Sequence, residues 1–277
     1  MITCKIGIIG GGNMARAIAG GLLRGGMHAT DLFISEPVVE RCDQLRQELF
    51  GAHITEDNRI VAQRADVILF AVKPQILQPV CRDLAADIQQ NQPLVMSIAA
   101  GPCSTDIEAW LGGDLAVIRV MPNQPAMIDQ GISALFANAL ASELQRNLAE
   151  KIMAAVGHVI WLDDEAKMDA VTAISGTGPA YFYLLIDVMI ESAIAYGIDE
   201  TTARQLAVET ARGATALAAA ETEDMSRLIE RVRSPGGTTM AAFEFLDAKD
   251  ARGIFTAAID KAAARAAELA ALANNDQ

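Results

Sequence analysis

The chain has 277 residues, of which 52% are hydrophobic and 21% are charged. This apolar share excludes a chain that is disordered throughout, and the length suggests two domains or one large one, at roughly 150 residues per domain. Lysine and arginine together number 22 against 35 aspartates and glutamates, a net charge of −13. A chain this acidic repels polyanions, so we expect neither nucleic acid nor an acidic membrane as a partner.

No uninterrupted apolar stretch approaches the ~18 residues that would suggest a membrane span. The best candidate, Ala180–Ile190, is interrupted by Asp187. Residues Met1–Ile9 have no cationic stretch before a long apolar region and no cleavage site, so we predict no signal peptide. We therefore expect a soluble cytoplasmic protein.

The cysteines and histidines are scattered along the chain. The cysteines are Cys4, Cys42, Cys81 and Cys103, and the histidines are His28, His53 and His158. Without a CxxC pair, buried reduced thiols are favoured over disulfides or a metal site. We expect no metal, and hydrolase triads and zinc chemistry have little support.

The first ~160 residues alternate short apolar runs with helical patterns, which is typical of a doubly wound parallel sheet. The expected strands are Lys5–Ile9, Leu32–Ser35, Val67–Val72, Leu94–Ile98 and Ala116–Val120. The helical patterns between them include Met14–Leu23, Val38–Leu49 and Ile76–Ile88. Further strands are expected at Gly131–Phe136 and His158–Leu162, around a helix that Ser142 could cap.

After Asp164 the strand signals stop and helical patterns continue to the C-terminus. The pattern over Lys167–Tyr196 is interrupted by Gly176, Gly178 and Pro179, which should bend or break the helix. Helices are then expected at Thr201–Ala220 and Ser226–Val232, with two more beyond residue 237. Alanine fills 11 of the 23 positions from 251 to 273, as in a compact bundle or a dimer interface. We predict two domains, residues 1–164 and 165–277.

A glycine motif follows the first expected strand. Gly10, Gly12 and Ala15 fit G-x-G-x-x-A, in which the first glycine permits a tight turn and the second lets the backbone approach a pyrophosphate. An acid, Glu36, ends the second strand, as in dinucleotide-binding units. We predict dinucleotide binding, the alternative being a glycine turn without a ligand. The expected cofactor contacts here are Ile9, Gly10, Gly11, Gly12, Asn13, Met14, Ser35 and Glu36, and we add Asn58.

Loops that close the later strands should lie at the carboxyl edge of the sheet, where ligands bind. In Phe70–Gln75 a proline ends the strand beside Lys73, which either faces a phosphate or is solvated. Small residues in Ser97–Gly101 would let a flat nicotinamide ring approach, and two prolines in Arg119–Ala126 indicate a rigid turn, the alternative being a plain structural one. The expected cofactor contacts are Ala71, Val72, Lys73, Pro74, Ile98, Ala99 and Ala100.

In the helical half, Ser234–Thr239 (SPGGTT) precedes a helix that should begin near Met240. Two glycines followed by a helix N-terminus make a nest of N–H donors, and either threonine could cap it. Such a nest binds a carboxylate without a cationic side chain. The alternative is an ordinary capped helix start.

These motifs together resemble those of the pyrroline-5-carboxylate reductases over essentially the whole chain. They are the glycine motif, Ala71–Pro74, Ser97–Gly101, Met121–Asn123, Ser175–Tyr181 and, most specifically, Ser234–Thr239. The resemblance implies a Rossmann domain followed by an all-α dimerisation domain whose helices interlock with a partner subunit. It implies a homodimer at least, with a ring of dimers left open, and active sites that combine one chain's cofactor domain with the partner's helical domain.

The resemblance also implies the reaction, which is NADPH- or NADH-dependent reduction of 1-pyrroline-5-carboxylate to L-proline, the final step of proline biosynthesis. Gly237, Thr238 and Thr239 would hold the substrate carboxylate, with the Thr239 hydroxyl near the imine nitrogen as the catalytic group. A protonated imine needs little activation, and the reaction therefore does not require a proton donor from the enzyme. Whether Thr239 donates a proton or only positions the substrate stays open. The residues that would shape the pocket are Met121, Pro122, Asn123, Ser175 and Gly176.

Three features of the sequence depart from the family pattern. Gln124 replaces a usual threonine, Asp224–Met225 replaces a common His-Pro, and Glu36 is an acid where many members are neutral or basic. A carboxylate at Glu36 favours NADH, whereas Ser35 with Arg41 could support a 2′-phosphate if Glu36 rotates away. We expect both cofactors to work.

Two other functions fit parts of the sequence. A β-hydroxyacid dehydrogenase would need a lysine on the long interdomain helix, and there is none between Ser175 and Tyr196. A non-catalytic nucleotide-sensing module would need the glycine motif but not the Ser234–Thr239 loop. Both are therefore less favoured than the reductase.

Overall fold

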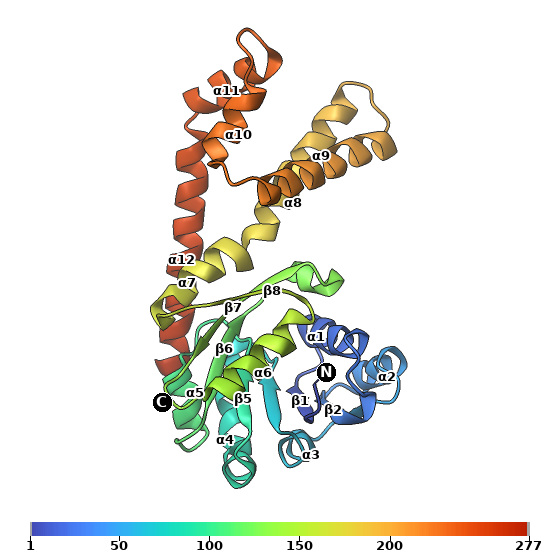
Figure 1. Ribbon diagram of the computed structural model, residues 1–277, viewed down its shortest axis with the longest axis vertical. Coiled ribbons are helices and arrows are strands. Elements are labelled where there is room, and N and C mark those ends of the chain that lie inside the picture. The colour runs from blue at the N-terminus through green and yellow to red at the C-terminus, as the bar shows by residue number, and fades with distance from the viewer. Residues whose placement is uncertain (1, 276–277) are drawn as a thin grey trace. The chain divides into compact units, whose positions relative to one another are not determined.

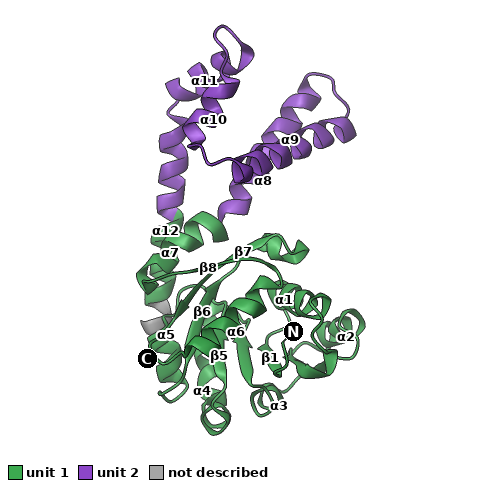
Figure 2. Ribbon diagram, in the orientation of Figure 1, with its two compact units in different colours: residues 1–176, 262–277 green, residues 177–261 purple. Residues whose placement is uncertain are grey.

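The computed structural model describes residues 2–275, with side chains to residue 271 (Figure 1). The chain forms two compact units, residues 1–176 with 262–277, and residues 177–261 (Figure 2). The first holds the sheet and its helices, and the second is helical. This confirms the predicted fold class of a doubly wound sheet followed by a helical region.

One eight-stranded sheet organises the first unit. Its strands are β1 (Ile6–Ile9), β2 (Leu32–Ser35), β3 (His53–Thr55), β4 (Val67–Phe70), β5 (Leu94–Ser97), β6 (Val117–Met121), β7 (Gly131–Ala137) and β8 (Gly157–Trp161). Their order is β3-β2-β1-β4-β5-β6-β7-β8, and every neighbouring pair is parallel except β6 and β7. The order of the first six strands is that of a Rossmann sheet, which places the carboxyl ends of β1, β4, β5 and β6 along one edge.

Helices cover both faces of this sheet (Figure 1). They are α1 (Asn13–Arg24), α2 (Val39–Glu48), α3 (Asn58–Ala62), α4 (Pro74–Asn91), α5 (Ser104–Trp110) and α6 (Glu143–Ala154), with short turns η1 (Ala29–Asp31) and η2 (Gln124–Ile128). One buried cluster joins α1 and α6 to the sheet, and the other joins α3, α4 and α5. Alternate residues of β4 enter the two clusters, as the period of a strand requires: Val67 and Leu69 enter one, Ile68 and Phe70 the other.

The predicted strands are present with shifts of one or two residues at their ends. Ser142 accepts a hydrogen bond from the Gln145 amide at the start of α6, which confirms the predicted cap. The prediction missed β3, α3 and α5. Strand β3 has three residues and no buried side chain, so it lacks the apolar run that marks the other strands.

The segment after β8 runs through η3 (Glu165–Lys167), α7 (Met168–Val171) and a π-helical turn, η4 (Thr172–Gly176). Helix α8 (Gly178–Ala195) follows, with a proline in its first turn, so the predicted interruption lies between η4 and α8. Residues 165–176 group with the sheet by their contacts. These contacts do not test whether the cofactor-binding and dimerisation functions divide after residue 164, so that domain boundary stays a prediction.

The remaining helices are α9 (Glu200–Ala220), α10 (Met225–Val232), α11 (Thr238–Ala248) and α12 (Ala251–Asn275). Many large apolar side chains of the second unit are exposed, among them Phe182, Leu185, Leu206, Phe245 and Phe255. By length and composition alone, Glu165–Ala195 would qualify as a membrane span, and few of its residues are buried. A helix that is covered by another subunit has the same composition.

Candidate active site

The glycine motif forms the turn from β1 into α1. Gly10 has a φ of +102°, and its amide donates to the Ser35 carbonyl at 2.8 Å. A Cβ here would lie 2.7 Å from the Ala71 carbonyl oxygen, so the backbone of β4's end approaches the turn closely. The structure therefore confirms that this position needs glycine for its conformation.

Gly12, in contrast, does not need glycine for its conformation. It is the N-cap of α1 in an ordinary extended conformation, and no side chain caps the helix in the described structure. A Cβ at this position would meet nothing within 4 Å. The start of α1 is thus open beside Gly12 and its amides have no side-chain cap, which fits the pyrophosphate of a dinucleotide.

The Glu36 carboxylate lies under the glycine turn and is only 4% exposed. It accepts hydrogen bonds from the Gly11 amide at 2.9 Å and from the Val38 amide at 3.1 Å. The Arg41 guanidinium lies 3.8 Å from it. Glu36 therefore braces the turn in addition to any contact with a ribose.

Ser35 and Asn58 are two further polar residues that we predict to contact the cofactor. The Ser35 side chain is fully buried, and its hydroxyl has no hydrogen-bond partner within the residues that the structure describes. Its carbonyl, which receives the Gly10 amide, is the part that shapes the site. Asn58 begins α3, directly after the Asp57 cap, which accepts from the Arg59 amide at 2.9 Å.

The loops after β4 and β5 continue the same edge of the sheet. The Ala71 amide donates to the Ile9 carbonyl at 2.8 Å, and the Ile98 amide donates to the Phe70 carbonyl at 3.1 Å. Lys73 is exposed and precedes Pro74, the first residue of α4. The structure thus brings the predicted cofactor residues of three loops to one edge. They are Ile9, Gly10, Gly11 and Gly12, then Ala71, Val72, Lys73 and Pro74, then Ile98, Ala99 and Ala100.

Two of the predicted pocket residues meet at the end of β6. A Cβ on Gly176 would lie 2.5 Å from the terminal methyl of Met121. The Asn123 side-chain oxygen accepts from the Ile132 amide at 3.0 Å, so Asn123 also holds the chain that enters β7. The Ser175 hydroxyl donates to the Val171 carbonyl within the helical segment. The first unit therefore places Gly176, and the segment that carries Ser175, against β6.

The second unit carries the remaining predicted residues. Gly236 has a φ of +70°, and the Gly237 amide donates to the Ser234 carbonyl at 2.9 Å. The prediction that a threonine caps the helix was wrong. Gly237 is the N-cap, without a side-chain hydrogen bond in the described structure, and α11 begins at Thr238, two residues before Met240. Thr238 and Thr239 therefore lie in the first turn of α11, after the N-cap residue.

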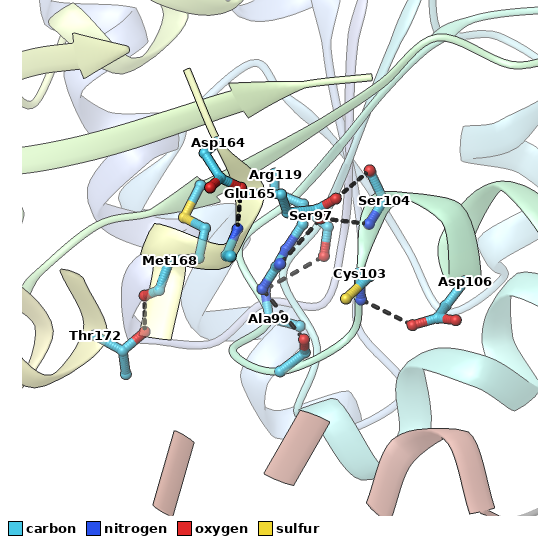
Figure 3. Close-up of polar contacts among 12 residues, drawn as sticks. Ser97, Ala99, Cys103, Ser104, Asp106, Arg119, Asp164, Glu165, Met168 and Thr172 are labelled. Atoms are coloured by element: carbon cyan, nitrogen blue, oxygen red, sulfur yellow. Dashed lines mark hydrogen bonds and ion pairs between the residues drawn. The ribbon is translucent and has the colours of Figure 1, made fainter. Parts of the chain in front are cut away.

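A buried polar cluster, which the sequence analysis missed, lies beside the β5–α5 loop. Arg119 of β6 is 6% exposed and forms an ion pair with Glu165, at 3.0 Å (Figure 3). It also donates to the Gly101 carbonyl. Glu165 in turn accepts from Ser104 at the start of α5. The sequence did contain a signal for this cluster, which is an arginine inside a strand of otherwise apolar residues. A charge buried there needs a partner of opposite charge.

The cysteines are free thiols, of which Cys42 and Cys81 are buried and Cys4 and Cys103 are half-buried. Burial raises the pKa of the Cys81 thiol to about 12. It also raises the pKa of Cys103, although Arg119 opposes that shift. Such thiols stay protonated at neutral pH and are poor nucleophiles. Within residues 2–275 no group of His, Cys, Asp and Glu side chains has the arrangement of a metal site.

Comparison with known proteins places this architecture. Residues 165–269 match the family described as pyrroline-5-carboxylate reductase dimerisation. The chain is 42% identical over 271 residues to the pyrroline-5-carboxylate reductase of Pseudomonas aeruginosa, with 98% of each chain covered. The chain belongs to the pyrroline-5-carboxylate reductase family. The Haemophilus influenzae enzyme is 38% identical, with 96% of this chain and 98% of that one covered.

The fold agrees with this assignment. The structure of a pyrroline-5-carboxylate reductase from Coxiella burnetii matches with a TM-score of 0.88 at 38% identity, covering 97% of this chain and 99% of that one. Residues 5–101 match a second family, described as NADP oxidoreductase, coenzyme F420-dependent. The resemblance inferred from the motifs is thus confirmed. The chain is an oxidoreductase of the NAD(P)-dependent class with a dimerisation domain.

Proposed function

We propose that this chain reduces 1-pyrroline-5-carboxylate to L-proline with NADPH or NADH. The observation that carries the proposal is the full-length relation to reductases of that name, at 42% identity. The open N-terminus of α1 at Gly12 supports it independently, because a dinucleotide needs such a site.

The reduced nicotinamide supplies a hydride when bound. The residues of the first unit would bind and orient it. The α1 amides would receive the pyrophosphate, Ala71–Pro74 would lie beside it, and the small residues Ala99 and Ala100 would leave room for a flat ring. Met121 and Gly176, in contact with each other, would form one wall of the substrate pocket and exclude water from it.

The start of α11 supplies the proposed substrate contacts. Its first amides are not taken by a side-chain cap, so they can donate to a carboxylate, and the helix dipole favours that charge. The Thr239 hydroxyl, in the same turn, would hydrogen-bond the imine nitrogen. The chemistry then needs positioning more than acid catalysis, because the imine can arrive already protonated.

Substrate identity is tested with three compounds: NADPH and NADH oxidation is followed with the cyclic imine and with a 2-oxo acid, and NADP+ and NAD+ reduction is followed with a β-hydroxyacid. Only the imine is expected to support rapid oxidation. Activity confined to the hydroxyacid couple, measured as cofactor reduction, would replace the proposal with the dehydrogenase alternative. Cofactor binding without turnover of any compound would favour the nucleotide-sensing alternative.

Replacing Glu36 with serine is expected to raise the NADPH/NADH ratio of kcat/KM by about tenfold, roughly 1.4 kcal/mol. The carboxylate would repel a 2′-phosphate and accept from a 2′-hydroxyl, and serine removes both effects. The variant also loses the carboxylate that accepts from the Gly11 and Val38 amides. This loss should weaken the binding of NADPH and of NADH to the same extent. The ratio, measured in steady state, separates the two effects. An unchanged or lower ratio would remove Glu36 from cofactor selection.

The dimerisation family match shows a chain built to form homo-oligomers. We propose that the assembly is obligatory for activity, since the exposed apolar side chains of α8 and α9 need a partner to cover them. Light scattering at micromolar concentration is expected to give at least a dimer, and the same measurement distinguishes a dimer from a ring of dimers. A stable, active monomer of 29.4 kDa would contradict the proposal.

We propose a cytoplasmic location, with the apolar residues of Glu165–Ala195 covered by the partner subunit and not by lipid. Asp187 in the middle of α8 supports this, because a charge is costly in a bilayer. Recovery of the active enzyme in the membrane fraction after cell lysis would contradict it.

A further inference from the structure

The arginine in the middle of β6, Arg119, uses both arms of its guanidinium. One nitrogen, Nη1, donates to Glu165 Oε1 at 3.0 Å (Figure 3). The other, Nη2, donates to the Gly101 carbonyl at 3.2 Å. The residue is 6% exposed. A single side chain thus joins a strand of the sheet, the β5–α5 loop and the segment that begins at η3.

The carboxylate of Glu165 is held from the other side by Ser104, the first residue of α5. The Ser104 amide donates to Oε1 at 2.6 Å, and the Ser104 hydroxyl donates to Oε2 at 2.7 Å. Both oxygens therefore have partners, and Arg119 supplies the opposite charge. Further hydrogen bonds thus hold both side chains of the pair, Arg119 through Gly101 and Glu165 through Ser104. The side chains of a surface ion pair lack such additional contacts.

Gly101, which receives the second arm of Arg119, is also confined. Its φ is +105°, and a Cβ at this position would lie 3.2 Å from the Ala270 amide nitrogen of α12. The loop of Ala99–Gly101 is thus held at its end between a guanidinium and a helix backbone. Its position depends on these contacts, since Gly101 itself imposes little conformational preference.

The contacts of the cluster connect the segments that carry two proposed sites. Arg119 stands two residues before Met121 on the same strand, and so on the same face. Glu165 begins the segment that ends at Gly176, and Gly176 contacts Met121. Arg119 therefore contacts both the loop that would receive the nicotinamide and the segment that leads to the proposed substrate wall.

We propose that Arg119 and Glu165 are positioning residues for hydride transfer, which hold the Ala99–Gly101 loop in register with Met121 and Gly176. The inference rests on the proposed function of this site. Hydride transfer depends steeply on the distance between donor and acceptor carbons, and a displacement of about 1 Å can cost on the order of 100-fold in rate. Cofactor affinity depends mainly on the glycine turn, which the cluster does not touch.

A lysine at position 119 separates this role from a purely electrostatic one. Lysine keeps the charge that faces Glu165, but its single ammonium lacks the planar fork that reaches two acceptors at once. Arg119→Lys is expected to lower kcat by about 10- to 100-fold, while the Kd of NADPH changes by less than about threefold. Ser104→Ala is a milder second variant, which removes one of the donors to Glu165, and we expect its kcat to fall by about threefold to tenfold.

Two further measurements make the test specific. Deuterium at the transferred position of NADPH should slow the Arg119→Lys enzyme more than the wild type, because misplacement makes the hydride step rate-limiting. Arg59→Met is the matched control. Arg59 pairs with Asp83 at 2.9 Å on the surface of the same unit, and its loss should leave kcat within about twofold.

Three outcomes would overturn the proposal. They are wild-type kcat in folded Arg119→Lys and Ser104→Ala, a loss of activity that follows the loss of melting temperature, and a loss that lies wholly in the Kd of NADPH. Failure of the proposed function gives a different result, because the wild-type enzyme would then not reduce the imine. In that case the emission of bound NADPH still reports on the loop, and an emission unchanged by Arg119→Lys would overturn the positioning role.

Discussion

Replacing Gly12 with valine is expected to raise the Kd of NADPH by about 100-fold while the melting temperature stays close to that of the wild type. The Cβ of residue 12 would meet no atom within 4 Å, and the φ of −70° suits any residue, so the folded chain should accept the side chain. The space that it fills is the approach to the α1 amides. Losing one or two charge-assisted hydrogen bonds there costs about 3 kcal/mol, which corresponds to the 100-fold change.

Gly10→Ala is the matched comparison for this prediction. Its φ of +102° is unfavourable for alanine, and the added methyl would lie 2.7 Å from the Ala71 carbonyl oxygen. We therefore expect Gly10→Ala to lose stability as well as cofactor binding. Titration of NADPH fluorescence and thermal melting of both variants are the measurements. Wild-type affinity in Gly12→Val would mean that the dinucleotide does not lie against the start of α1.

The parts of the fold that could be predicted are those with strong local patterns. The buried strands β1, β4 and β5 are continuous apolar runs, and Gly10 must adopt a conformation that few other residues tolerate. In contrast, β3 consists of three partly exposed residues. Its position is determined by pairing with β2, and that pairing is not visible in the sequence of the strand itself.

The candidate site shows the same limit. The cofactor residues follow individual strands, so the sheet topology brings them together once the strands are known. The Arg119–Glu165 pair joins positions 46 residues apart, and no local motif links them. The cap of α11 was mistaken for a related reason. Threonine favours N-caps, but the loop geometry places Gly237 at that position.

The arrangement at α11 makes Thr239 a clean target for substitution. Thr239 is the second residue of the helix, and the cap is provided by the backbone of Gly237. Valine has the same shape as threonine and keeps its branched Cβ. Thr239→Val therefore removes one hydroxyl with little expected change in stability.

Thr239→Val is expected to lower kcat/KM for the imine by about 10- to 150-fold, because one hydrogen bond to a charged group is worth roughly 1.5–3 kcal/mol. If Thr239 were instead the general acid, the loss would lie mainly in kcat, would reach about 10²- to 10⁴-fold and would change the pH profile. We expect the smaller loss with an unchanged profile, since an imine that arrives protonated needs no donor.

The matched control is Thr201→Val. Thr201 is also the second residue of a helix, α9, whose cap is the Asp199 side chain, and it belongs to no proposed site. Steady-state kinetics and melting curves of both variants distinguish the loss of a substrate contact at Thr239 from a general effect of valine near the start of a helix. A similar loss in both variants would assign the effect to helix stability. Wild-type kcat/KM in Thr239→Val would exclude Thr239 from the site, leaving the amides at the start of α11 as the only proposed contacts of that turn with the substrate.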